Sequence, residues 1–350
     1  MKKTLIASAI AAATFSGAAF AADGNMSASE LAAKMDSMPQ VYGNIQYAVD
    51  YTDIDGSGSG LDHFDNGTTL GVKHDHEIMP GLTGFLKLEL EGINANNKAS
   101  SSGIDSLDEA YVGVMGDGFG QLWVGSDDSL YESSIAKIAN FHEIGTGLDG
   151  SYTTGEGDLI QYKTPSFGGL TLGAAVQING ETDAESKSYP YQLAATYAVD
   201  AFELAVAMDS NDGNTGYSKD GFDGEVVDPA ELDDNNENTY GVRATYSMDN
   251  VSVTGEYQTR KDVSKEFGVI GVYSMGANQF SAAYQVVEDD APGASNGDKE
   301  DVIALQALHN VSDHMYVYVE SFFYSADNDN EYAVGADQKT RTAVGAVYYF

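Results

Sequence analysis

The last ten residues of the chain, 341–350, alternate between two kinds of side chain. On one face of an extended strand, side chains become steadily more apolar and end in two aromatic rings: Thr342, Val344, Ala346, Tyr348 and Phe350. Terminal residues of soluble domains are usually frayed and polar. A strand that closes a membrane barrel turns one face to lipid and carries aromatic rings at the headgroup boundary. The pattern therefore favours a membrane barrel over the buried edge strand of a soluble sheet.

The same alternation recurs along the chain with a regular spacing. It is clear in residues 41–51, 82–91, 170–178, 189–199, 202–208, 240–248 and 280–286. Seven short turns alternate with eight longer loops, near 52–67, 94–104, 127–157, 180–188, 210–238, 260–264, 288–299 and 326–337. We therefore predict an all-β fold, a transmembrane antiparallel β-barrel of about sixteen strands with its short turns on the periplasmic side. An even strand count lets the first and last strands pair, which removes the open edges.

The first 39 residues do not follow the strand pattern. Residues 1–21 combine Lys2 and Lys3 with an Ala-rich apolar run and a small-residue cleavage site, which is typical of a cleaved signal peptide. Residues 22–39 contain a capping box from Ser27 to Glu30 and one apolar helical face before Pro39. They predict a short periplasmic segment, helical or flexible. The alternative is that the apolar face packs against neighbouring subunits or partly occludes the barrel mouth. The barrel itself is predicted over 40–350.

Composition excludes several classes of protein. The chain has no cysteine, which rules out disulfides and thiolate metal sites. Removal of the signal peptide leaves 15 basic residues against 54 acidic ones, a net charge of −39. A chain with this charge is not a nucleic-acid binder, because such proteins neutralise phosphates with basic side chains. The 39 Gly and 22 Tyr suit close packing in a barrel wall and aromatic rings at two membrane interfaces.

Four motifs carry a family resemblance. They are DEAYVGV at 108–114, GFGQLWVG at 118–125, LIQYKTPSFGGL at 159–170 and the terminal YYF at 348–350. Together they resemble the general-diffusion porins of Gram-negative outer membranes, over essentially the whole mature chain. The resemblance implies a trimeric sixteen-stranded barrel whose third loop folds inward and narrows a water-filled channel for ions and small hydrophilic solutes. It also implies contact with outer-membrane lipid and lipopolysaccharide, and a C-terminal signal, Tyr348 and Phe350, that the outer-membrane assembly machinery reads.

Acidic residues dominate the third loop. Against a single Lys137, it contains Asp127, Asp128, Glu132, Glu143, Asp149, Glu156 and Asp158, and residues 130–140 could form a short helix. In a wet constriction each unit charge is worth on the order of 1–4 kcal/mol to a passing ion, so uncompensated carboxylates favour cations. We assign the first five of these acids to the constriction. The alternative is that individual acids point to bulk water or hydrogen-bond the barrel wall.

The basic side of the constriction departs from the family pattern. Members of the family commonly carry Arg where Asp108 stands and another Arg where Ser126 stands. Alternation places five other basic side chains on the lumen face: Lys73, Lys87, Lys163, Arg243 and Arg341. These residues either form a residual basic wall or pair with acids such as Glu89 and Glu91.

Metal and catalytic motifs are weak. Asp53-x-Asp55-x-Ser57-Gly58 resembles the start of a calcium loop, but its twelfth position is Phe64 rather than Glu. His74-x-His76 fits a membrane interface better than a zinc site, and no hydrolase motif is present. We therefore predict no metal, no cofactor and no enzymatic activity. The leading function is a passive outer-membrane channel. The alternatives are a solute-specific channel, a closed barrel serving as a surface adhesin or receptor and, ranked last, a hydrolase.

Overall fold

The computed structural model describes residues 38–99, 103–104, 106–178, 189–211, 216–218, 232–234, 237–293 and 295–350. The predicted signal peptide and residues 22–37 lie outside this part of the chain, as do the central residues of two long loops. Within the described residues, no helix reaches the length and apolarity needed to cross a membrane.

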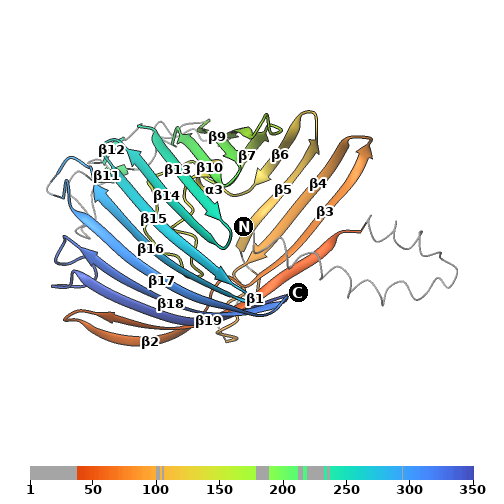
Figure 1. The fold of residues 1–350 in the computed structure, drawn as a ribbon. Coiled ribbons are helices and arrows are strands. Elements are labelled where there is room, and N and C mark those ends of the chain that lie inside the picture. The colour runs from red at the N-terminus through yellow and green to blue at the C-terminus, as the bar shows by residue number, and fades with distance from the viewer. Residues whose placement is uncertain are drawn as a thin grey trace.

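The strands form one closed antiparallel barrel. Except within residues 58–79, each strand of this sheet pairs with the next strand of the sheet along the chain, and the last strand, β19 (Gln338–Tyr349), pairs with the first, β1 (Gln40–Ile54) (Figure 1). Two strands share one position in the wall, because β3 (Thr69–Met79) pairs with the first half of β1 and β2 (Gly58–Asp65) with the second half. The seventeen-stranded sheet therefore has sixteen positions, which confirms the predicted fold.

The remaining strands follow the order of the chain. They are β4 (Leu82–Glu91), β5 (Ser106–Gly116), β6 (Gly120–Ser126), β7 (Leu159–Lys163), β8 (Leu170–Gln177), β9 (Tyr191–Val199), β10 (Phe202–Asp209), β13 (Thr239–Met248), β14 (Val251–Arg260), β15 (Ser264–Met275), β16 (Asn278–Asp289), β17 (Lys299–Ser312) and β18 (Met315–Ala326). A separate two-stranded pair, β11 (Gly216–Ser218) with β12 (Leu232–Asp234), lies in the long loop after β10. One short helix, α3 (Leu130–Ser134), follows β6.

Side-chain alternation separates the two faces of the wall. On β19, Val344 and Tyr348 are 59% and 51% exposed, whereas Ala343 and Val347 on the other face are fully buried. Apolar side chains form the exposed outer face of most other strands as well. An exterior of this kind is stable against hydrocarbon, and closing the sheet satisfies the backbone groups that lipid could not.

Two of the eight predicted loops are three-residue turns. The segment 58–65 was predicted as part of a loop because it is rich in Gly and Asp. It pairs as β2 with Tyr47–Ile54, across the turn 55–57. The predicted loop at 260–264 is the turn 261–263 between β14 and β15. Gly56 and Asp262 adopt positive φ angles of 68° and 57°, the left-handed conformation that such tight turns need.

Candidate functional site

The loop 127–158, between β6 and β7, lies against the polar inner face of the barrel. Its helix α3 begins after Ser129, whose side chain accepts a hydrogen bond from the Glu132 N–H at 3.3 Å. Leu130 and Tyr131 of α3 are buried against the wall strands β8, β9 and β10. The wall position facing Tyr131 is Gly241, where an added Cβ would lie 2.5 Å from the Tyr131 hydroxyl. A glycine there lets the helix approach the sheet closely.

Three wall carboxylates each hold the loop with two hydrogen bonds. Glu256 accepts the backbone N–H groups of Lys137 and Ile138 at 3.1 and 3.4 Å. Glu320 accepts those of Glu143 and Ile144 at 2.7 and 3.2 Å. Asp209 accepts both the N–H and the hydroxyl of Thr154. We call Asp209, Glu256 and Glu320 the clasp carboxylates. They are buried and lie on three different strands, so they attach the loop to the wall along most of its length.

Apolar and amide contacts complete this attachment. Ile138 and Leu148 of the loop pack with Phe322 and Tyr324 of β18 in the largest buried cluster of the described residues. The Gln285 side chain accepts the Thr146 hydroxyl at 2.5 Å and donates to the Leu148 carbonyl at 3.3 Å. The main core of the molecule therefore lies between the loop and the inner wall.

The helix in the loop is shorter than the prediction of 130–140. It ends at Ser134, whose carbonyl accepts a hydrogen bond from Arg243 Nε at 2.8 Å. The N–H groups that would continue the helix, from Lys137 and Ile138, donate to Glu256 instead, and the Lys137 N–H also donates to the Ile135 carbonyl at 2.8 Å. The competition between wall and helix for these donors explains the early end.

Four of the five predicted constriction acids form one group. Asp127 accepts the Trp123 indole N–H at 2.6 Å, and Asp128 and Asp149 are exposed. Glu132 accepts the Asn140 amide at 2.8 Å. The charges of Asp128 and Asp149 act on Glu132 electrostatically, as does that of the exposed Glu156. We call Asp127, Asp128, Glu132, Asp149 and Glu156 the loop acid group.

Mutual repulsion and burial perturb these carboxyls. Burial first, and then the charges of Glu156 and Asp128, raise the pKa of Glu132 to about 7. Burial also raises the pKa of Asp127, although the hydrogen bond from Trp123 acts in the opposite direction. Burial and the nearby Arg243 lower the pKa of Lys137, the only lysine of the loop, to about 8. The loop thus carries a negative charge that varies near neutral pH.

Glu143, the fifth predicted constriction acid, is fixed to the wall. Its carboxylate accepts the Tyr316 hydroxyl at 2.8 Å, and its carbonyl accepts the Asn66 amide at 2.8 Å. This is the alternative that the sequence left open, an acid that hydrogen-bonds the barrel wall.

Three of the five predicted basic residues are paired with acids. Lys87 lies between Glu89, at 3.4 Å, and Glu109. Arg243 donates to Glu203 at 2.7 Å in addition to its bond with α3. Arg341 donates from Nε to Asp50 at 2.7 Å. These pairs leave little uncompensated positive charge at those positions.

Of the other two basic residues, Lys73 directly faces Lys87 in the register of β3 and β4, and the charges of Lys87 and Glu89 act on it. The Lys73 ammonium lies 5.3 Å from the centre of the Tyr42 ring. Lys163 is exposed at the end of β7, next to the short connection to β8. Lys73 and Lys87 are therefore neighbours, whereas Lys163, Arg243 and Arg341 lie on three other strands, so the five residues do not gather into one basic surface.

Sequence reasoning missed an acidic group on the wall beside the loop. Glu89 and Glu109 both pair with Lys87, Asp108 lies beside these two carboxylates, and Tyr42 donates its hydroxyl to Glu89 at 2.5 Å. The strand register shifts between β4 and β5 at this point. Glu89 faces Glu109 and the next residue, Leu90, faces Leu107, so no residue of β4 lies opposite Asp108. Such a bulge places two neighbouring acids on the same side, which alternation does not predict. The departure from the family pattern at Asp108 was the available signal. We call Glu89, Asp108 and Glu109 the wall acid group.

The wall and loop acid groups are adjacent. The charges of Asp127 and Asp128 act on Glu109, and that of Glu91 acts on Glu156. In the described part of the chain, no three His, Asp or Glu side chains are placed to hold a metal ion.

Comparison with known proteins shows what this barrel is similar to. A family model described as Gram-negative porin matches residues 7–331. The chain is 29% identical to a protein named monosaccharide porin from a Halomonas species, over 96% of this chain and 98% of that protein. Halomonas elongata has a protein named major outer membrane protein with the same identity and coverage.

Solved structures show the same fold at low sequence identity. An anion-selective porin from Comamonas acidovorans superimposes with a TM-score of 0.70 at 18% identity, over 89% of this chain and 99% of that one. OmpF of Salmonella typhi, in a complex with daunomycin, superimposes with a TM-score of 0.69 at 17% identity, over 90% and 98% of the two chains.

Proposed function

We propose that this chain, which belongs to the Gram-negative porin family, forms a water-filled outer-membrane channel through which ions and small hydrophilic solutes diffuse passively. The loop 127–158 would narrow the lumen, because the clasp carboxylates hold it against the inner wall. The narrowest passage would then run beside the loop and wall acid groups. Family members are channels rather than enzymes, and we assign this chain no reaction.

We further propose that the channel prefers cations. The observation that carries this proposal is the adjacency of the two acid groups, whose eight carboxyls have three lysines near them in the described part of the chain, Lys73, Lys87 and Lys137. The positively charged side chains that would balance them, Arg243 and Arg341, are paired with acids elsewhere. An uncompensated carboxylate a few Å from a passing ion is worth on the order of 1–4 kcal/mol, which is enough to set the sign of selectivity.

The barrel fold by itself leaves this sign open. One structural neighbour is named anion-selective, and its 18% identity establishes a common fold only. Selectivity depends on the side chains at the narrow passage, and this chain has Asp108 and Ser126 at two positions where arginine is common in the family.

The reversal potential in a salt gradient tests the proposal. A bilayer with the full mature protein and a tenfold KCl gradient should show a potential of the sign that cation flow gives. Replacing three loop acids together, Asp127→Asn, Asp128→Asn and Glu132→Gln, should move that potential towards zero. Asp117→Asn, on an exposed short turn, is the matched control and should leave it unchanged. An anion-type potential in the unmodified protein would refute the preference, whereas absent conductance would refute the channel.

A solute-specific channel is the second candidate, because a relative covering nearly the whole chain is named monosaccharide porin. Current block that saturates with sugar concentration would support it. A closed barrel acting as an adhesin or receptor would instead show no conductance.

We also propose a homotrimer in contact with outer-membrane lipid and lipopolysaccharide, inserted by the assembly machinery through the C-terminal signal. Cross-linking in intact outer membranes that gives no three-chain species would contradict the trimer.

A further inference from the structure

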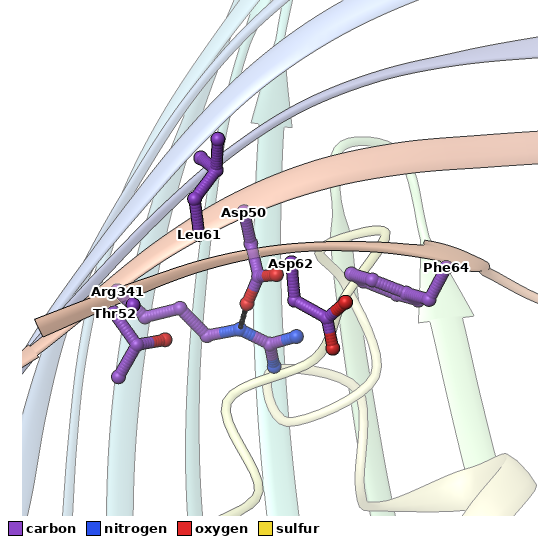
Figure 2. A pocket seen from close by; sticks show the side chains of 7 residues that line it. Asp50, Thr52, Leu61, Asp62, Phe64 and Arg341 are labelled. Carbon is purple, nitrogen blue, oxygen red and sulfur yellow. Dashed lines mark hydrogen bonds and ion pairs between the residues drawn. The ribbon is translucent and has the colours of Figure 1, made fainter.

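A pocket on the inner face of the wall lies apart from both acid groups. It has a volume of about 490 Å³ and lies where β1, β2 and β19 meet. Its polar lining consists of Asp50, Thr52, Asp62 and Arg341, with the Phe64 ring at one side (Figure 2). Leu61, between Gly60 and Asp62, points to the opposite face of the sheet (Figure 2). The volume is within the range of ordinary small-molecule sites.

Arg341 offers hydrogen-bond donors to this pocket. Its Nε is bonded to Asp50, and the guanidinium lies 5.3 Å from the centre of the Phe64 ring. These two contacts fix the plane of the guanidinium. Within the described residues, its two terminal nitrogens have no hydrogen-bond partner, and the side chain is 30% exposed. A guanidinium fixed in this way presents several N–H donors in one plane.

Asp62 offers acceptors to the same space. It directly faces Asp50 in the strand register and is exposed. One of its oxygens accepts the N–H of His63 at 2.8 Å, and no ion pair joins it to Arg341 among the described residues. Donors and acceptors therefore stand side by side without satisfying each other. The half-buried Thr52 hydroxyl can act in either role.

The chemistry of the pocket selects a hydroxyl-rich ligand. A hydroxyl is the small neutral group that both accepts from a guanidinium and donates to a carboxylate. Neighbouring hydroxyls on one molecule can satisfy Arg341 and Asp62 together, while carbon-bound hydrogens pack on Phe64. With two carboxylates and one guanidinium the pocket has a net charge of −1, which disfavours anions. We propose that it is a binding site for neutral polyhydroxylated solutes of monosaccharide size on their way through the channel. This inference rests on the proposed channel function.

Single-channel recording with D-glucose as the probe tests this site. Saturable reduction of the current is expected in the unmodified protein. Asp62→Ala should raise the half-saturating glucose concentration at least about tenfold, because it removes a charge-assisted hydrogen bond. Arg341→Gln should act in the same direction. Asp53→Ala is the matched control, since Asp53 is an exposed acid on the opposite face of β1, and it should have no effect.

The outcomes separate the inference from the proposed function. Open channels without saturable glucose block would overturn the site and leave the channel intact. Block that Asp62→Ala and Arg341→Gln leave unchanged would place sugar binding elsewhere and also overturn it. Stronger block by glycine than by glucose would assign the pocket to zwitterions instead. Because Asp62 is exposed and makes no hydrogen bond or ion pair with the loop 127–158 among the described residues, its substitution tests binding without removing an attachment of that loop.

Discussion

Replacing Glu320 with alanine should release the middle of the loop 127–158 from the wall. The Glu320 carboxylate is buried and accepts three hydrogen bonds, from the N–H groups of Glu143 and Ile144 and from the Gln306 amide. Each hydrogen bond to a charged group contributes about 1.5–3 kcal/mol, and part of the loss is recovered if water enters. We expect a net cost of about 3–5 kcal/mol for the attached state. That corresponds to a rise of roughly 150-fold or more in local opening, at about 1.4 kcal/mol per tenfold.

Amide hydrogen exchange measures this opening directly. Peptides covering Glu143 and Ile144 should exchange faster in Glu320→Ala by about the same factor, while peptides from β1 and β19 keep their protection. Single-channel traces should show more current noise, because the loop would move in the lumen. Glu77→Ala removes an exposed glutamate on β3 that makes no hydrogen bond to the loop among the described residues, and it controls for loss of a carboxylate. Unchanged protection at Glu143 and Ile144 would refute the reasoning, since apolar packing would then be sufficient to hold the loop.

Three further predictions concern charge, assembly and packing. Cation preference should fall between pH 8 and pH 6, because a pKa of about 7 takes Glu132 from about 90% to about 10% ionised while Lys137, with a pKa of about 8, gains positive charge. Glu132→Gln should make that profile of reversal potentials shallower and leave the part that Lys137 contributes. Deleting Phe350 should reduce the yield of heat-resistant barrel in outer membranes, since its backbone exchanges two 3.1 Å hydrogen bonds with Gly43 and its ring is part of the proposed assembly signal. Phe350→Leu keeps the backbone hydrogen bonds and removes the aromatic ring, so it separates these two causes. Gly345→Ala should destabilise the barrel in urea by about 1–3 kcal/mol, because an added Cβ would overlap the buried Tyr318 ring, whereas Gly271→Ala has open space and should not.

Alternation predicted the fold because each strand of a barrel meets the same two environments. Lipid outside and a polar interior inside leave a two-residue period in the sequence that needs no knowledge of distant contacts. The period in residues 342–350 correctly placed Val344 and Tyr348 on the outer face of β19. It failed where polarity reflects conformation rather than environment, as in the Gly-rich segment that forms β2.

The candidate site was only partly predictable, because its geometry depends on long-range pairs. Nothing in the local sequence around Glu256 or Glu320 shows that each will meet loop backbone more than a hundred residues away along the chain. The bulge that turns both Asp108 and Glu109 inward is likewise a property of two strands together. The acidic loop could be recognised from composition alone, whereas the direction in which each of its acids points could not.

These placements change the meaning of the chain's net charge of −37. The clasp carboxylates accept loop hydrogen bonds and are buried, so they act on loop position rather than on a passing ion. Further acids are paired with Lys261, Lys265 and Lys299 at the ends of strands, where solvent screens them. Under the proposed function, the adjacent loop and wall acid groups act on a passing ion, together with the exposed Asp62 on the inner face of β2. Cation preference should therefore depend on those few residues, and a chain with the same composition but a basic residue at position 108 would have a different channel.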